Sequence, residues 1–208
     1  MKKTCLTIFI FIINFCFAAD KKEISSPDGK IKVVVEGGPK LLYAVHYEGK
    51  ALLLPSEINM QLQNGGSLSD QLRFKKTTVR KHNTVIVSPV PEKRKYIPDT
   101  YNELTIRFRQ PFSLVVRVYN DGMAYRILSH FSDSIIVRQE TATFNFPPNH
   151  HLYFPEVVKR DNTDIYHTSF EEPYQLKPLD SVTKDNLCFT PVLIAPQTGP
   201  KILLTESD

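Results

Sequence analysis

Four acidic residues in the stretch 161–172 are the side chains of this sequence that could do chemistry together. Asp161, Asp164, Glu171 and Glu172 lie among aromatic residues and prolines without a sustained hydrophobic period, which is typical of a loop. A glycosidase needs two carboxyl groups flanking one bond, and a single loop rarely supplies both sides of a cleft. Carboxylates also suit Ca²⁺, although the spacing of an EF-hand is absent. The residues alone favour a solvated loop over a metal ligand.

The adjacent pair in "SFEEPYQ" cannot act as matched catalytic groups. On an extended chain, neighbouring side chains point to opposite faces, so Glu171 and Glu172 would diverge. The same argument separates His150 and His151 in "NHHLYF", where a polar loop is favoured over a metal site. Cys188 lies in an apolar strand context that favours core packing, and no serine sits in a Gly-x-Ser-x-Gly elbow. No catalytic residue is therefore predicted.

The N-terminus has the pattern of a secretory signal peptide. Lys2 and Lys3 precede an apolar run that ends at Phe17, and Ala18 is the small residue before the expected cleavage site. The run is shorter than the roughly 20 apolar residues of a membrane span. Lipidation of Cys16 is a less favoured alternative, because Asn14 and Phe15 are not the small residues it requires. We expect residues 1–18 to be a signal peptide and the protein to be exported, into the periplasm.

Charge and cysteine content exclude several classes of function. The formal net charge falls from +4 to +2 when Lys2 and Lys3 leave with the signal peptide, so neither nucleic acid nor an anionic membrane is an expected partner. Only Cys188 then remains, which excludes an intramolecular disulfide and a cysteine-based zinc site.

The elements that must position these side chains are short strands. Apolar and polar residues alternate over 31–36 and in a hairpin that turns at 48–50, and a further strand is expected at 57–63. The segment 78–89 reads as a second hairpin with its turn at His82-Asn83. No stretch keeps a helical period.

The clearest alternation lies in 102–131. Its Asn120-Asp121-Gly122 sequence predicts a tight turn, because positive φ angles suit these residues. A strand pair is expected over 134–146, then a loop from Pro147 to about residue 185, and a last hairpin about residues 197–199. The pattern predicts an all-β antiparallel sandwich over residues 19–208, incomplete at its C-terminus because the last strand would be an open edge.

Several motifs, taken in order, resemble one known family. The most specific is "RVYNDGMAYR", and it is accompanied by "ISSPDGKIKVVV", "LLYAVHYEGKALLLPSEI", "EEPY" and "TPVLIAPQTGPKILLTESD". Together they resemble the N-terminal domain of glycoside hydrolase family 97, which comprises exported α-glucosidases and α-galactosidases of Bacteroides-type bacteria. The resemblance covers the whole mature chain and implies a galactose-mutarotase-like super-sandwich.

The resemblance also implies a partner and a cofactor. In this family the sandwich precedes a (β/α)₈ barrel that carries the catalytic carboxylates, and glucosidase-type members bind calcium with one glutamate donated by the sandwich. Glu171 of Glu171-Glu172-Pro173-Tyr174 stands at the ligand position, with Glu172 as the alternative register. We therefore expect a chain truncated before the barrel, unable to hydrolyse glycosides alone, that meets calcium only together with the barrel.

Three functional interpretations remain open at this stage. The first is an accessory domain that contributes to the substrate and calcium site of an α-glucoside or α-galactoside hydrolase. The second is a free-standing carbohydrate-binding or interaction protein that uses aromatic side chains, namely Tyr153, Phe154, Tyr166, Phe170 and Tyr174. The third is a gene fragment without function.

Overall fold

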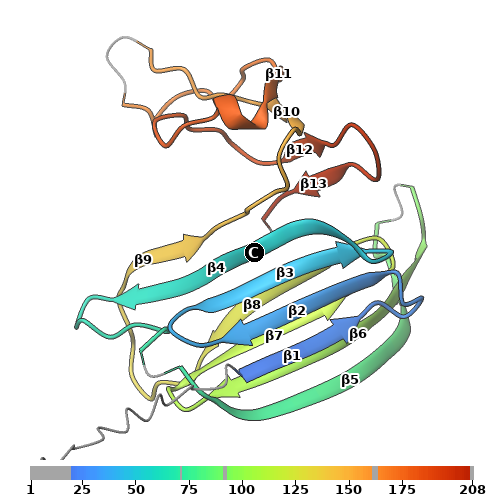
Figure 1. The fold of residues 1–208 in the computed structure, drawn as a ribbon, viewed down its shortest axis with the longest axis vertical. Coiled ribbons are helices and arrows are strands. Elements are labelled where there is room, and N and C mark those ends of the chain that lie inside the picture. The colour runs from blue at the N-terminus through green and yellow to red at the C-terminus, as the bar shows by residue number, and fades with distance from the viewer. Residues whose placement is uncertain (1–19, 71, 91–92, 161–163, 207–208) are drawn as a thin grey trace, which may run out of the picture.

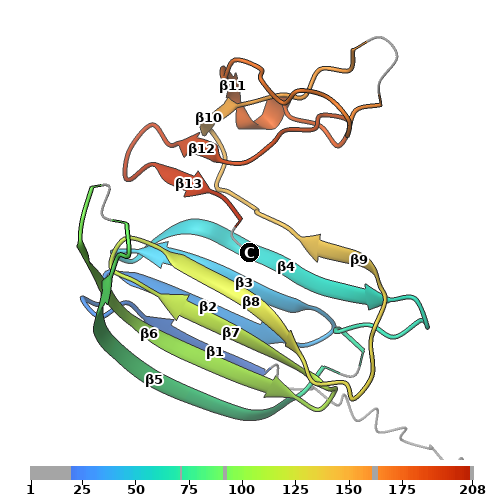
Figure 2. The same cartoon turned by 180° about the vertical axis from the view of Figure 1, so that it is seen from behind.

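Three antiparallel sheets make up the described part of the chain. The computed structural model describes residues 20–70, 72–90, 93–160 and 164–206, so the predicted signal peptide lies outside the described residues. Figures 1 and 2 show two sheets stacked face to face and a third, smaller sheet beyond β4 and β9. The predicted all-β antiparallel sandwich is confirmed, but it takes in the chain only to β9, and the last four strands form a separate sheet.

The first sheet of the sandwich has five strands in the order β1-β2-β3-β4-β9. Their bounds are β1 (Asp20–Ser25), β2 (Ile31–Gly37), β3 (Leu41–Tyr47), β4 (Lys50–Leu62) and β9 (Val137–Ala142). The predicted hairpin between β3 and β4 is present. Glu48 and Gly49 both have positive φ, 49° and 81°, which is the two-residue turn that matches strand twist.

The second sheet has four strands in the order β5-β6-β7-β8. Their bounds are β5 (Phe74–Val87), β6 (Tyr96–Phe108), β7 (Phe112–Val118) and β8 (Met123–Ser129). The far ends of β5 and β6 run beyond the sandwich as a two-stranded ribbon (Figure 1), where Val85, Val87 and Tyr96 are exposed.

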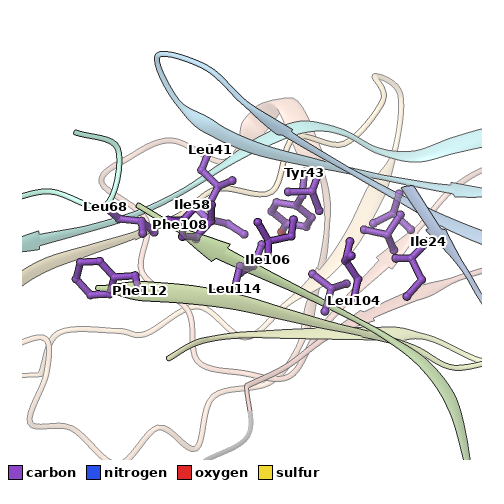
Figure 3. Packing of buried hydrophobic residues seen from close by; sticks show 14 of the residues in the cluster. Ile24, Leu41, Tyr43, Ile58, Leu68, Leu104, Ile106, Phe108, Phe112 and Leu114 are labelled. Atoms are coloured by element: carbon purple, nitrogen blue, oxygen red, sulfur yellow. The ribbon is translucent and has the colours of Figure 1, made fainter. Parts of the chain in front are cut away.

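The main hydrophobic core lies between these two sheets. Alternation sends one face of each strand inward, and the apolar residues predicted to share a face in 104–108 and 114–118 are buried. Figure 3 shows Leu41 and Tyr43 from the five-stranded sheet above Ile106 and Leu114 from the four-stranded sheet. Burial of these apolar residues stabilises the packing of the two sheets, and Phe144 and Phe146 from the segment after β9 also pack against this core.

The third sheet has the order β11-β10-β12-β13 and its own small core. Its elements are β10 (His151–Phe154), β11 (Gln175–Pro178), the 3₁₀ turn η1 (Leu179–Ser181), β12 (Val192–Ala195) and β13 (Ile202–Leu204). Four buried residues form this core, Leu152, Phe154, Val192 and Ile194. Phe146 packs against both cores and so joins the small sheet to the sandwich.

The predicted turn at His82-Asn83 is wrong. Both residues lie inside β5, where they pair with Tyr101 and Thr100 of β6. The His82 ring stacks on Tyr101 at 4.6 Å between centroids, and Thr100 Oγ1 donates a hydrogen bond to Asn83 Oδ1 at 2.8 Å. Tyr101 and Thr100 on the partner strand therefore provide contacts for two polar residues whose types suggested a turn. The chain turns only after β5 ends at Val87.

The Asn120-Asp121-Gly122 hairpin is present, but its predicted reason is wrong. None of these three residues has a positive φ, and the connection is a four-residue loop closed by the Tyr119 N–H on the Gly122 carbonyl at 2.8 Å. Asn120 instead uses its side chain, since Oδ1 accepts a hydrogen bond from the Asp28 N–H at 3.0 Å.

Three predicted boundaries also change. The strand expected at 57–63 is the second half of β4, which begins at Lys50. The pairing between β3 and β4 shifts register beside Val45, and this irregularity lets β4 continue through Pro55, which has no N–H to donate. The strand pair expected at 134–146 is the single strand β9, paired with β4. The loop expected after Pro147 contains β10 and β11, whereas the last hairpin is confirmed as β12 and β13.

Candidate functional site

The acidic segment belongs to the long connection between β10 and β11, which returns to the small sheet through two aromatic residues. Phe170 and Tyr174 flank the Glu171-Glu172 pair, and both rings meet the ring of Phe189 edge-on, at 6.2 and 6.1 Å between centroids. The Tyr174 hydroxyl also donates to the Pro191 carbonyl at 3.1 Å. The two glutamates are therefore held between aromatic anchors.

The structure separates the two glutamates by their environment. Glu172 is partly buried and accepts a charge-assisted hydrogen bond from Arg160 Nη2 at 2.9 Å. Glu171 is exposed, and within the described residues no hydrogen bond or ion pair involves its side chain. Phe170, just before it, has a φ of 52°, a left-handed conformation that is uncommon for residues other than glycine. Glu171 thus presents an uncommitted carboxylate to solvent, whereas Glu172 has a structural partner.

The other acidic candidates do not join this pair. Asp164 accepts hydrogen bonds from the Tyr166 N–H at 2.8 Å and from His167 Nδ1 at 2.7 Å. The hydrogen bond with His167 is the main reason that the pKa of Asp164 lies below its usual value. Asp161 lies outside the described residues. Asp164 is thus engaged in its own local turn.

A polar cluster at the base of the same connection escaped the sequence analysis. The Glu156 carboxylate accepts hydrogen bonds from Lys177 Nζ of β11 and from Asn186 Nδ2, the latter at 2.6 Å. These hydrogen bonds, the one from Lys177 first, lower the pKa of Glu156. Lys177 Nζ also lies 5.5 Å from the Phe154 ring centroid. The three polar residues are far apart in sequence, so no local motif predicts the cluster.

Calcium can be tested against this set of side chains. The ion takes about six to eight oxygen ligands. Within the described ranges, no group of three or more histidine, cysteine, aspartate or glutamate side chains could hold a metal ion. The described residues therefore hold no ready cluster of acidic side chains for calcium, and Glu171 fits the role of a single carboxylate ligand.

The remaining reactive side chains have structural surroundings. Cys188 packs against the small core, and burial together with the Glu156 carboxylate raises the pKa of its thiol, which makes it a poor nucleophile. Ser113 Oγ and His130 Nε2 are 2.7 Å apart, but Ser113 is only 3% exposed and cannot meet a substrate. His151 lies in β10, paired with β11 and β12.

The five aromatic residues considered for sugar binding do not share one surface. Phe154 is buried in the small core at 3% exposure, and Tyr153 next to it in β10 lies on the opposite face of the small sheet. Phe170 and Tyr174 serve as loop anchors, and Tyr166 is 70% exposed at another point of the loop. Phe189, which the sequence analysis did not select, is the side chain that organises this region. Its only sequence signal was its position in the apolar run before the last hairpin.

Comparison with known proteins assigns the class. The family described as Glycosyl-hydrolase 97 N-terminal matches residues 24–208, and the chain belongs to this family. A curated relative, the retaining alpha-galactosidase of Bacteroides thetaiotaomicron, is 29% identical over 212 aligned positions, which cover 100% of this chain and 32% of the relative. The chain therefore spans about a third of the curated relative that it matches.

Solved structures share the fold. A crystal structure of a beta-arabinopyranosidase superposes with a TM-score of 0.78 at 24% identity and covers 90% of this chain and 31% of its own. A Glycoside Hydrolase Family 97 enzyme from a Pseudoalteromonas species, in complex with acarbose, superposes with a TM-score of 0.70 at 19% identity and covers 85% and 27%. The same enzyme is also known with panose. In the described part of our chain, no helix has the length and apolar character needed to cross a membrane.

Proposed function

We propose that this chain is the N-terminal accessory domain of an exported family 97 α-glycosidase, which packs on a (β/α)₈ catalytic barrel and contributes to its substrate and calcium site. The observation that carries the proposal is the family match over residues 24–208 together with a curated relative about three times as long. The substrate class is an α-glucoside or α-galactoside oligosaccharide. The alpha-galactosidase activity of the curated relative supports this class.

Glu171 is the residue through which the domain would reach the active site. Its carboxylate is exposed and uncommitted, while its neighbour Glu172 is paired with Arg160. This difference supports Glu171 as the donated calcium ligand and speaks against the alternative register. A bound Ca²⁺ would supply positive charge near the substrate oxygens, and the role of this chain is to position one of its oxygen ligands.

The test of Glu171 needs an enzyme that carries this chain as its N-terminal part. Calcium titration by calorimetry should show affinity lowered at least about tenfold in Glu171→Gln, since even the loss of a group that only orients a metal ligand commonly costs about that much. Glu172→Gln is the matched control, because it removes the neighbouring charge and the Arg160 pair, and it should leave calcium affinity nearly unchanged. Unchanged affinity in Glu171→Gln would remove this residue from the site.

The chain alone should not hydrolyse glycosides. The two glutamates of the acidic loop are adjacent in sequence and Glu172 is paired with Arg160, whereas hydrolysis needs two carboxyl groups on opposite sides of one bond. Purified residues 19–208 incubated with p-nitrophenyl α-galactoside and α-glucoside should release no nitrophenol above the rate of a boiled sample. Clear turnover would contradict the proposal.

Export can be checked on the processed protein. Removal of residues 1–18 predicts a mature N-terminus at Ala19, which intact-mass measurement of the periplasmic protein reports directly. A mature protein that begins at an acylated Cys16 would instead identify a lipoprotein, and an uncleaved chain would contradict export by this route.

A further inference from the structure

The small sheet carries a row of apolar side chains on the face opposite its core. Leu176, Tyr153, Leu193 and Leu203 are direct neighbours in the strand register, so they form one row across all four strands. In β10, β12 and β13 the neighbours along each strand point the other way, into or against the core that contains Leu152 and Ile194. The row ends are open to solvent, with Leu176 at 57% and Leu203 at 60% exposure.

This outward face carries no aspartate, glutamate, lysine or arginine at any strand position that the structure describes. Its positions are occupied by His151, Tyr153, Leu176, Pro178, Leu193, Ala195 and Leu203. The outward faces of the sandwich are different, because charged pairs cross them: Lys21 with Glu36, Lys32 with Glu23, and Arg117 with Glu103. Charged outward faces are those that an antiparallel sheet leaves in water. The small sheet instead has the composition of a sheet covered on both faces.

The size of the row decides what kind of partner could cover it. Strands about 4.8 Å apart with a rise of about 3.3 Å per residue give four short strands an area of about 250 Å². A stable complex between separate proteins buries about 800 Å² on each partner. A second copy of this chain would therefore gain too little from this face. A domain on the same polypeptide needs less area, since tethering supplies a local concentration of about millimolar.

We infer that the outward face of the small sheet, defined by Leu176, Tyr153, Leu193 and Leu203, is the surface on which the catalytic domain docks. The inference rests on the proposed function and adds the place of contact to it. The docking partner would present an uncharged, apolar surface. The same small sheet anchors the connection that carries Glu171, so docking on this face would bring that carboxylate and the catalytic domain together.

A chimera gives a direct test, because this chain aligns over its whole length with a segment that makes up 32% of the retaining alpha-galactosidase. In the chimera, this chain replaces that segment. Single cysteines are introduced as Leu176→Cys and Leu203→Cys, with Lys32→Cys on the outward sandwich face as the control. Labelling with a maleimide is followed at each site by peptide mass spectrometry, in the chain alone and in the chimera. All three positions are exposed, so the substitutions should not disturb folding.

We expect labelling at Leu176→Cys and Leu203→Cys to slow at least about tenfold in the chimera and to stay unchanged at Lys32→Cys. An active chimera in which both small-sheet positions label as fast as in the chain alone would overturn the docking face while leaving the accessory role intact. An inactive chimera without protection at any position would count against the accessory role as well. Concentration-dependent protection in the chain alone would assign the face to a second copy and overturn the inference.

Discussion

The sandwich and the small sheet differ in how completely each buries its own apolar residues. Between its two sheets the sandwich buries a cluster that includes Ile106, Phe108 and Leu114, and its outward faces carry ion pairs. Among the described residues, the small sheet has a core of four buried residues, and its other face carries an apolar row whose ends, Leu176 and Leu203, are exposed. The comparison indicates that the sandwich buries its apolar residues between its own two sheets, whereas we propose that the small sheet uses its second face and Glu171 to contact a partner domain.

Core truncation should separate the two regions most strongly. Ile106→Ala, in the sandwich core, should lower the free energy of unfolding of the whole chain by about 2–5 kcal/mol. Ile194→Ala removes the same groups from the small core and should release mainly β10–β13. Urea denaturation with native-state hydrogen exchange reports both effects. If Ile194→Ala shifted the global transition as far as Ile106→Ala, the two regions would be one cooperative unit.

Two neighbouring glycines, Gly37 and Gly38, test how closely the side chains of the sandwich core are packed. A Cβ at Gly37 would lie 2.6 Å from Cε1 of Phe74, whose ring packs edge-on against Phe108. Gly37→Ala should therefore cost about 1–3 kcal/mol of stability through overpacking. Gly38→Ala, where a Cβ meets nothing within 4 Å, should change stability by less than about 0.5 kcal/mol. Equal changes in melting temperature in the two variants would show that the Phe74 ring can move away from the added methyl group without loss of stability.

Acid should loosen the small sheet before the sandwich. Because Lys177 and Asn186 lower the pKa of Glu156 below its ordinary value of 4.5, the ionised carboxylate stabilises the folded small sheet above about that pH. This contribution is lost as the pH falls through the lowered pKa, and it is at most about 1 kcal/mol for a partly exposed pair. The rate of amide hydrogen exchange in β10 and β11, corrected for the intrinsic pH dependence of exchange, should therefore rise in this acidic range.

Glu156→Gln is the control for the acid effect. It should abolish this pH dependence in β10 and β11 while exchange in β2 and β7 stays the same. Exchange in β10 and β11 that still rose with acid in Glu156→Gln would assign the effect to another group.

The sequence was most informative where alternation was strict. The apolar positions of β6 and β7 and the last hairpin followed from local pattern, because the period of two decides which face is buried. The turn at His82-Asn83 failed because a partner strand supplied Tyr101 and Thr100, which no local pattern reveals. The short strands β10 and β11 were missed because long-range pairing, not local propensity, defines them.

The candidate site was predictable only in part. The pair Glu171-Glu172 was found from residue type and family resemblance. The two residues differ because Arg160 pairs with Glu172, and Arg160 lies eleven positions before Glu171, where no local pattern predicts this contact. Phe189 and Glu156 were missed for the same reason, since both act through contacts with residues distant in the chain. The apolar row of the small sheet emerged only from the strand register.

The most direct test of this account is hydrogen exchange measured on the chain alone and within the active chimera. The account predicts that β12, β13 and the segment 169–176 exchange at least about tenfold more slowly in the chimera, while β2 and β7 exchange at the same rate in both. Unchanged exchange in the small sheet of an active chimera, with new protection confined to the sandwich, would contradict the account.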